Sequence, residues 1–150
     1  MRILIYGVLL LSLLVGCAGN KDALTESTDA SLGAKNEGIR VEEDLGLEVI
    51  GMRWTAAGNM LDFRWRAIDP IKAEILFSRK DIPYLIHQNS GAKFLVPNAG
   101  KVGPLRQTTN KPVAGKSYFI FFANPGKYVK RGDKVTIVVG DHQIRDLVVE

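Results

Sequence analysis

Regular alternation of apolar and polar residues near the middle of the chain is the feature that most constrains its fold. Every second residue of LDFRWRA, residues 61–67, is apolar. Side chains of a strand point to opposite faces in turn, so this pattern is typical of a strand with one buried and one solvated face. Residues 47–55 also alternate, and Ala57-Gly58-Asn59 is a turn signal between the two segments. We therefore predict a β-hairpin here.

The hairpin has one irregularity, and further strands follow it. The alternation slips between Val49 and Ile50, which favours a bulge at Gly51. Residues 84–87 and 93–96 flank a turn signal and predict a second hairpin, and residues 135–139 and 144–149 predict a third around Gly140-Asp141. With residues 117–123, about seven short strands occupy residues 45–150. This spacing predicts an all-β fold, an immunoglobulin-like antiparallel β-sandwich.

Three other segments of this region carry weaker predictions. Residues 117–123, SYFIFFA, are apolar on both faces, so we expect a central, covered strand with Phe121 in the core. Asp69-Pro70 has the residues of a helix start, but residues 71–79 fit a short helix or an edge strand equally well. Residues 97–115 are rich in Gly, Pro, Asn, Lys and Thr and predict a long loop.

The first sixteen residues have the pattern of a secretory signal. Met1-Arg2 is a short positive start, and residues 3–15 are apolar apart from Gly7 and Ser12. Thirteen helical residues extend roughly 20 Å, which is too short for a hydrocarbon core of about 30 Å. A positive start, a short apolar centre and a small residue at the end predict a signal peptide over residues 1–16.

Leu14-Val15-Gly16-Cys17 then resembles the lipobox of bacterial lipoproteins. In that family the signal is cut before the cysteine, whose sulfur carries a diacylglycerol. The resemblance implies lipidation at Cys17, which is the only cysteine of the chain. Stable membrane attachment takes more than one acyl chain, and a diacylated or triacylated cysteine supplies them. No aspartate follows Cys17, so the resemblance also implies the outer membrane, facing the periplasm. A plain secretory signal with a chance cysteine is the alternative.

Residues 17–44 would join this lipid to the domain. They are polar and lack aromatic residues, so they predict a flexible tether with a reach of roughly 30 Å. A short helix near residues 22–31 is the alternative. Residues 18–44 carry three basic and seven acidic residues, whereas residues 45–150 carry sixteen basic and nine acidic ones. A basic domain favours contact with an anionic surface or an envelope protein, and nucleic acid is not expected outside the cytoplasm.

Three arginines are candidate ligand-binding residues. The alternation places Arg53, Arg64 and Arg66 on one face of the first hairpin, with the tryptophans on the other. A row of guanidinium groups suits an anionic ligand. The alternative is pairing of these arginines with Asp62 and Glu48 on a solvated face.

A metal site is the second function that the sequence leaves open. Thioether and imidazole groups suit copper, and the weak candidates are Met52, Met60, His87 and His142. Met52 also fits a core position, because it alternates with Trp54.

Enzyme motifs fit poorly, and we expect no catalytic residues and no cofactor. Ser90 and Arg131-Gly132-Asp133 have the residues of turns, and residues 110–117 miss a phosphate-binding loop by their first glycine. Neither histidine lies in a recognisable nucleophile motif. The sequence therefore predicts a non-enzymatic, lipid-attached envelope protein that presents a β-sandwich, with a periplasmic copper-handling or metal-handling module as the alternative.

Overall fold

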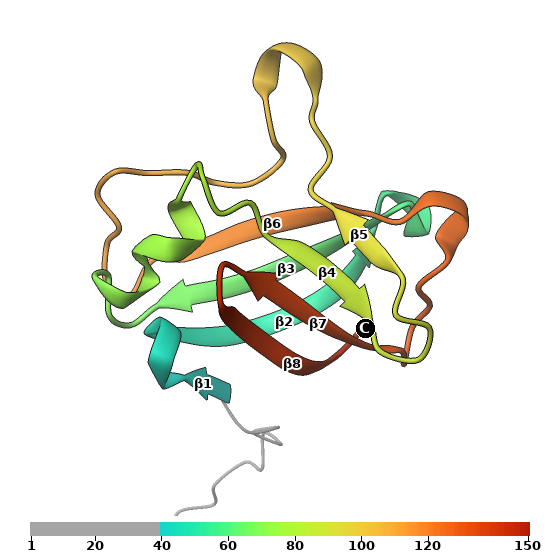
Figure 1. Cartoon of the computed structure of the whole chain (residues 1–150), viewed down its shortest axis with the longest axis horizontal. Coiled ribbons are helices and arrows are strands. Elements are labelled where there is room, and N and C mark those ends of the chain that lie inside the picture. The colour runs from blue at the N-terminus through green and yellow to red at the C-terminus, as the bar shows by residue number, and fades with distance from the viewer. Residues whose placement is uncertain (1–39) are drawn as a thin grey trace, which may run out of the picture. The chain divides into compact units, whose positions relative to one another are not determined.

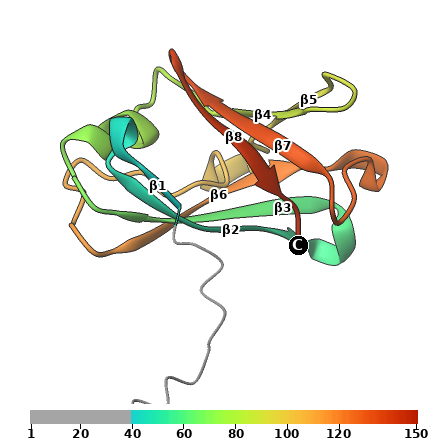
Figure 2. The same cartoon turned by 90° about the horizontal axis from the view of Figure 1, so that it is seen from below.

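A computed structural model describes residues 40–150, which form two antiparallel sheets of four strands each. The sheets lie one over the other with the core between them, as Figure 1 and Figure 2 show. The predicted all-β sandwich is confirmed, with eight strands where about seven were expected. Among the described residues, no helix has the length and apolar character to cross a membrane.

The first sheet has the strand order β1-β2-β3-β6. Its strands are β1 (Arg40–Glu42), β2 (Leu47–Thr55), β3 (Met60–Ala67) and β6 (Ser117–Ala123). β2 and β3 form the predicted hairpin, and their register shifts between Val49 and Gly51, where the slip in alternation predicted a bulge.

The second sheet has the order β5-β4-β7-β8. Its strands are β4 (Tyr84–His87), β5 (Lys93–Leu95), β7 (Lys134–Val139) and β8 (His142–Val148). Both predicted hairpins are present in it. In an immunoglobulin domain the second strand pairs with the fifth, whereas here β2 pairs with β3, so the likeness holds for the sandwich architecture.

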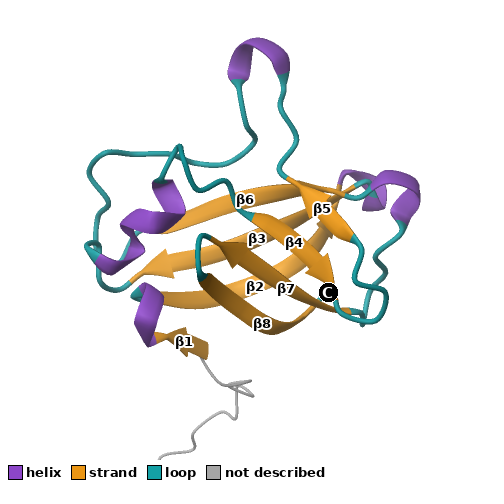
Figure 3. Cartoon of the chain, viewed as in Figure 1, coloured by secondary structure: helices purple, strands orange, loops and turns teal. Residues whose placement is uncertain are grey.

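Short 3-10 helices connect the strands, coloured purple in Figure 3. They are η1 (Glu43–Leu45), η2 (Ala56–Gly58), η3 (Lys72–Phe77), η4 (Gly100–Val102) and η5 (Pro125–Lys127). η3 resolves the choice left open for residues 71–79 in favour of a helix. The carboxylate of Asp69 accepts hydrogen bonds from the backbone N–H groups of Ile71 and Lys72, as its place before a helix predicted.

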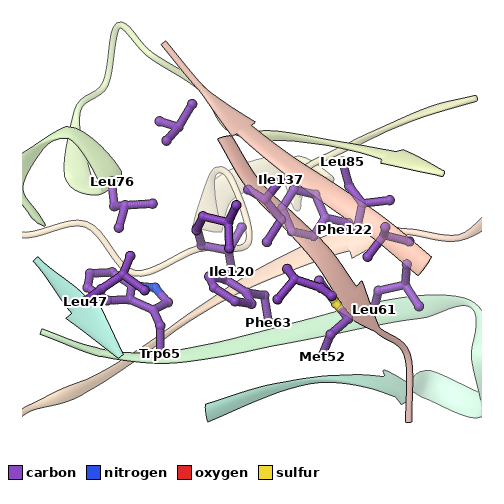
Figure 4. Close-up of a cluster of buried hydrophobic side chains, with 14 of the residues drawn as sticks. Leu47, Met52, Leu61, Phe63, Trp65, Leu76, Leu85, Ile120, Phe122 and Ile137 are labelled. Atoms are coloured by element: carbon purple, nitrogen blue, oxygen red, sulfur yellow. The ribbon is translucent and has the colours of Figure 1, made fainter. Parts of the chain in front are cut away.

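The core contains the inward-facing residues of both sheets. Trp65 of β3, Phe77 of η3 and Tyr118 of β6 contact one another, with ring centroids 4.7–5.2 Å apart. Figure 4 shows the centre of this core. The largest side chains with under 2% exposure there are Trp65, Phe63, Phe122, Leu47, Met52, Leu61, Leu76, Leu85, Ile120, Ile137, Ile144 and Val129.

The prediction of a central, covered strand over residues 117–123 was wrong. β6 is the last strand of its sheet, and Phe121 is half-buried on the outer face, where its ring lies 4.9 Å from that of Phe119. The inward residue is the neighbouring Phe122, which has no exposed surface. The covered strand is β7, in which all five residues from Val135 to Val139 are buried. The outward-facing aromatic residues of β6 are therefore partly buried and not fully covered.

The folded region begins earlier than residue 45, inside the segment predicted as tether. β1 pairs with β2 in the register Arg40–Val49, and η1 follows it directly. The polar composition of these residues hid the strand, because an edge strand needs little apolar surface. The rest of residues 17–44, together with Cys17 and the predicted signal peptide, lies outside the described residues.

The last two residues join the two sheets. Val149 follows β8 but pairs in parallel with Met52 of β2. The backbone of Glu150 accepts a hydrogen bond from Trp54 N and donates one to Met52 O, both 2.9 Å long. These residues therefore cover the part of the β2 edge that the short β1 does not reach.

Candidate functional site

The three candidate arginines share the outer face of the β2–β3 hairpin, and each one has an acidic partner. Arg66 donates to Glu48 at 2.8 Å across the hairpin, and Arg64 donates to Asp62 on its own strand at 2.8 Å. Arg53 lies 3.5 Å from the carboxylate of Glu150. Because three carboxylates balance three guanidinium groups, this face offers an anion little net attraction.

The four weak metal candidates lie in different places. Met52 is a core residue with 1% exposure, and Met60 begins β3, three residues before Phe63, which lies opposite Met52. His87 lies opposite Val135 of β7, and His142 lies opposite Val139. Four residues along a strand separate those positions, which is roughly 13 Å. No three His, Cys, Asp or Glu residues within residues 40–150 are grouped to hold a metal. The four candidate residues are therefore not brought together in the described part of the chain.

Sequence reasoning missed an array of three side chains, His87, Ser90 and Asp133, at the turn of the β4–β5 hairpin. Nδ1 of His87 is 2.7 Å from Oγ of Ser90, and Nε2 is 3.3 Å from Oδ2 of Asp133. His87 is buried, and its ring packs edge-on against Tyr128. Serine, histidine and aspartate in this order resemble the members of a nucleophilic triad.

The contacts of the array fit a structural role better than catalysis. His87 Nε2 is buried and has no hydrogen-bond partner, although Oδ2 of Asp133 lies 3.3 Å away. A base whose orienting partner is not hydrogen-bonded is poorly placed to take a proton. Ser90 Oγ also accepts from Ala92 N, which closes the predicted turn. Asp133 accepts from Lys130 N and so forms the turn that residues 131–133 predicted.

Arg106 is the most unusual charged residue of the described chain. It lies in the long loop, where Arg106 forms a bridge with Ile120 and so extends the first sheet beyond β6. Because Ile120 faces the core, Arg106 opposite it also points inward, and only 8% of its surface is exposed. Its guanidinium donates to the backbone carbonyls of Leu76, at 3.3 Å, and Ser78. These carbonyls end η3, so Arg106 holds the loop against that helix.

The charge of Arg106 is not balanced by any acidic side chain among residues 40–150. No carboxylate there forms an ion pair with it, and its buried Nε has no hydrogen-bond partner. Burial lowers the pKa of the guanidinium, because the charged form loses solvation. Buried cations are normally paired with an acidic group, so this one calls for an explanation.

Arg106 also lines a cavity of about 350 Å³. Arg106 and the exposed Arg79 supply its positive charge, Thr108 supplies a hydroxyl group, and Ile82, Val102 and Pro104 supply apolar surface. Sequence reasoning missed this site because residues 97–115 carry turn signals only. The pairing of Arg106 with Ile120 joins segments that are not neighbours in the sequence, so no local sequence pattern predicts it.

Comparison of the chain with protein-family models, with curated proteins and with solved structures finds no match in any of the three.

Proposed function

We propose that this chain is a lipid-attached protein of the bacterial cell envelope, which holds a non-enzymatic β-sandwich at a membrane and presents a binding surface. The observation that carries the proposal is Leu14-Val15-Gly16-Cys17 at the end of a short apolar run. A small residue before a cysteine at that place is the requirement for lipoprotein processing. The absence of an aspartate after Cys17 supports the outer membrane, facing the periplasm.

The arrangement of the sandwich supports a presenting role. Its described chain begins in β1, which is one edge of the first sheet, and Arg106 lies beyond β6 at the other edge. At about 4.8 Å per strand, roughly 19 Å separates these two edges. Figure 1 shows the loop with η4 projecting on the side away from β1. A domain attached through its N-terminal edge would therefore present the Arg106 cavity away from its attachment.

Fatty-acid labelling in a Gram-negative host tests the proposal. We expect an alkyne-bearing fatty acid to label the wild-type chain and not Cys17→Ser. As a control, Ser27→Cys in the Cys17→Ser background restores a thiol outside the motif and should stay unlabelled. Membrane fractionation should place the wild type with the outer membrane. Equal labelling of wild type and Cys17→Ser would contradict the proposal.

A further inference from the structure

Arg106 combines three properties that a structural arginine does not need together. Its guanidinium is buried, its charge has no acidic partner in residues 40–150, and it lines a cavity open enough to admit a ligand. Two backbone carbonyls use only part of its five N–H groups, and Nε remains without a partner. A carboxylate placed in the cavity would supply the missing negative charge.

We propose that this cavity, between the segment after η3 and the loop with η4, binds a small carboxylate that carries an apolar chain. The planar guanidinium suits a carboxylate, because both groups can form two parallel hydrogen bonds. Arg79 adds a second positive charge, and Thr108 adds a hydroxyl donor. This site goes beyond the proposed lipid attachment and does not depend on it.

The apolar residues that line the cavity indicate the chemical character of the rest of the ligand. Ile82 and Val102 are exposed, at 55% and 81%, although both line the cavity together with Pro104. Removing apolar surface of this kind from water contributes roughly 25 cal/mol per Å², so an apolar chain on the carboxylate adds affinity. A volume of about 350 Å³ lies at the lower end of ligand pockets, which favours a short chain.

Binding of hexanoate to the full chain in detergent micelles tests this site. The readout is the NMR signal of the Arg106 Nε–H group, which is buried and should be observable. We expect a saturable shift with hexanoate and none with hexanamide, which has the same chain but no charge. A comparable response to hexanamide, or no saturable shift with hexanoate, would overturn the proposal. A response to inorganic phosphate at lower concentration than to hexanoate would overturn the assignment to carboxylates.

Variants at the cavity separate ligand binding from the structural role of Arg106. Val102→Glu places a carboxylate at the cavity and should abolish the hexanoate response, whereas Val113→Glu, exposed on another part of the loop region, should keep it. Arg79→Gln should weaken binding roughly threefold, the usual size for an exposed charge, and the neighbouring Lys80→Gln should not. Arg79→Gln and Lys80→Gln each remove one exposed charge, so we expect both variants to fold as the wild type does. Full hexanoate binding by Val102→Glu would overturn the proposal.

Discussion

At the scale of single residues, two buried polar side chains differ in whether all of their hydrogen-bonding groups have partners. Asn124 has no exposed surface, and its amide donates to the carbonyls of Gly58 and Val129 while accepting from Val129 N, each at 2.9 Å. Its bonds hold the turn after β6 against η2. Arg106, by contrast, keeps a buried N–H group without a partner. A satisfied buried group such as Asn124 supports the fold, whereas the buried and unpaired charge of Arg106 is the observation behind the proposed carboxylate site.

Neighbouring phenylalanines of β6 provide the first prediction. Phe122 has no exposed surface, so Phe122→Ala should lower the free energy of unfolding by about 3–5 kcal/mol through the cavity that it leaves. Phe121→Ala, on the half-buried outer face, should cost about 1 kcal/mol. Denaturant unfolding of both variants measures the difference. A larger loss for Phe121→Ala would mean that the inward and outward faces of β6 are exchanged.

At the scale of elements, close packing of η1 against η3 depends on one glycine. Gly46 ends η1 with a φ of +57°, and a Cβ atom there would lie 2.7 Å from both Cβ and the carbonyl oxygen of Asp69. Its carbonyl also accepts the backbone N–H groups of Ile68 and Asp69. The contact joins the start of the sandwich to the segment before η3. The C-terminal end of η3 is in turn held by Arg106.

Gly46→Ala should therefore be far more costly than a glycine substitution in open space. We expect a loss of about 3 kcal/mol or more, from left-handed backbone strain together with the clash at Asp69. Gly100→Ala is the matched control, because Gly100 has a φ of +52° but nothing within 4 Å of the new Cβ. It should lose about 1 kcal/mol from strain alone. Equal melting temperatures for the two variants would contradict the close packing.

The sequence predicted the elements whose pattern is local. Alternation over residues 61–67 gave the buried face of β3, and the slip at Ile50 located the bulge. Two features depend on distant pairing and were missed. β1 is recognised only by its contact with β2, and the placement of β6 at a sheet edge depends on which strands neighbour it. The same reason hid the Arg106 cavity, because its residues come from two segments on either side of the second hairpin.

At the scale of the whole molecule, the described unit from Arg40 to Glu150 contains its own core and both sheets. Its three-residue β1 covers the edge of β2 only opposite residues 47–49, and the C-terminal residues cover the part near Met52. On both sides of the bulge, the edge of β2 is thus covered only by short segments. An uncovered strand edge exposes backbone groups that can pair with another molecule.

Comparison of two truncated chains tests this boundary. Residues 40–150 should fold alone into a β-rich domain by far-ultraviolet circular dichroism. Residues 45–150, which lack β1, should be less stable by about 1–2 kcal/mol and more prone to self-association, because the edge of β2 is uncovered. Urea unfolding and size-exclusion chromatography measure both effects. Equal stability of the two chains would show that β1 contributes nothing to the domain.

The central claim is that a lipid on Cys17 attaches this sandwich to a membrane, and the mass of the N-terminal peptide tests it most directly. The wild-type chain is extracted from host membranes and digested, and its first peptide is measured by mass spectrometry. Our account predicts a peptide that begins at Cys17 and carries a diacylglyceryl group on the sulfur. A peptide that begins at any other residue, or a Cys17 that carries a free thiol, would contradict it.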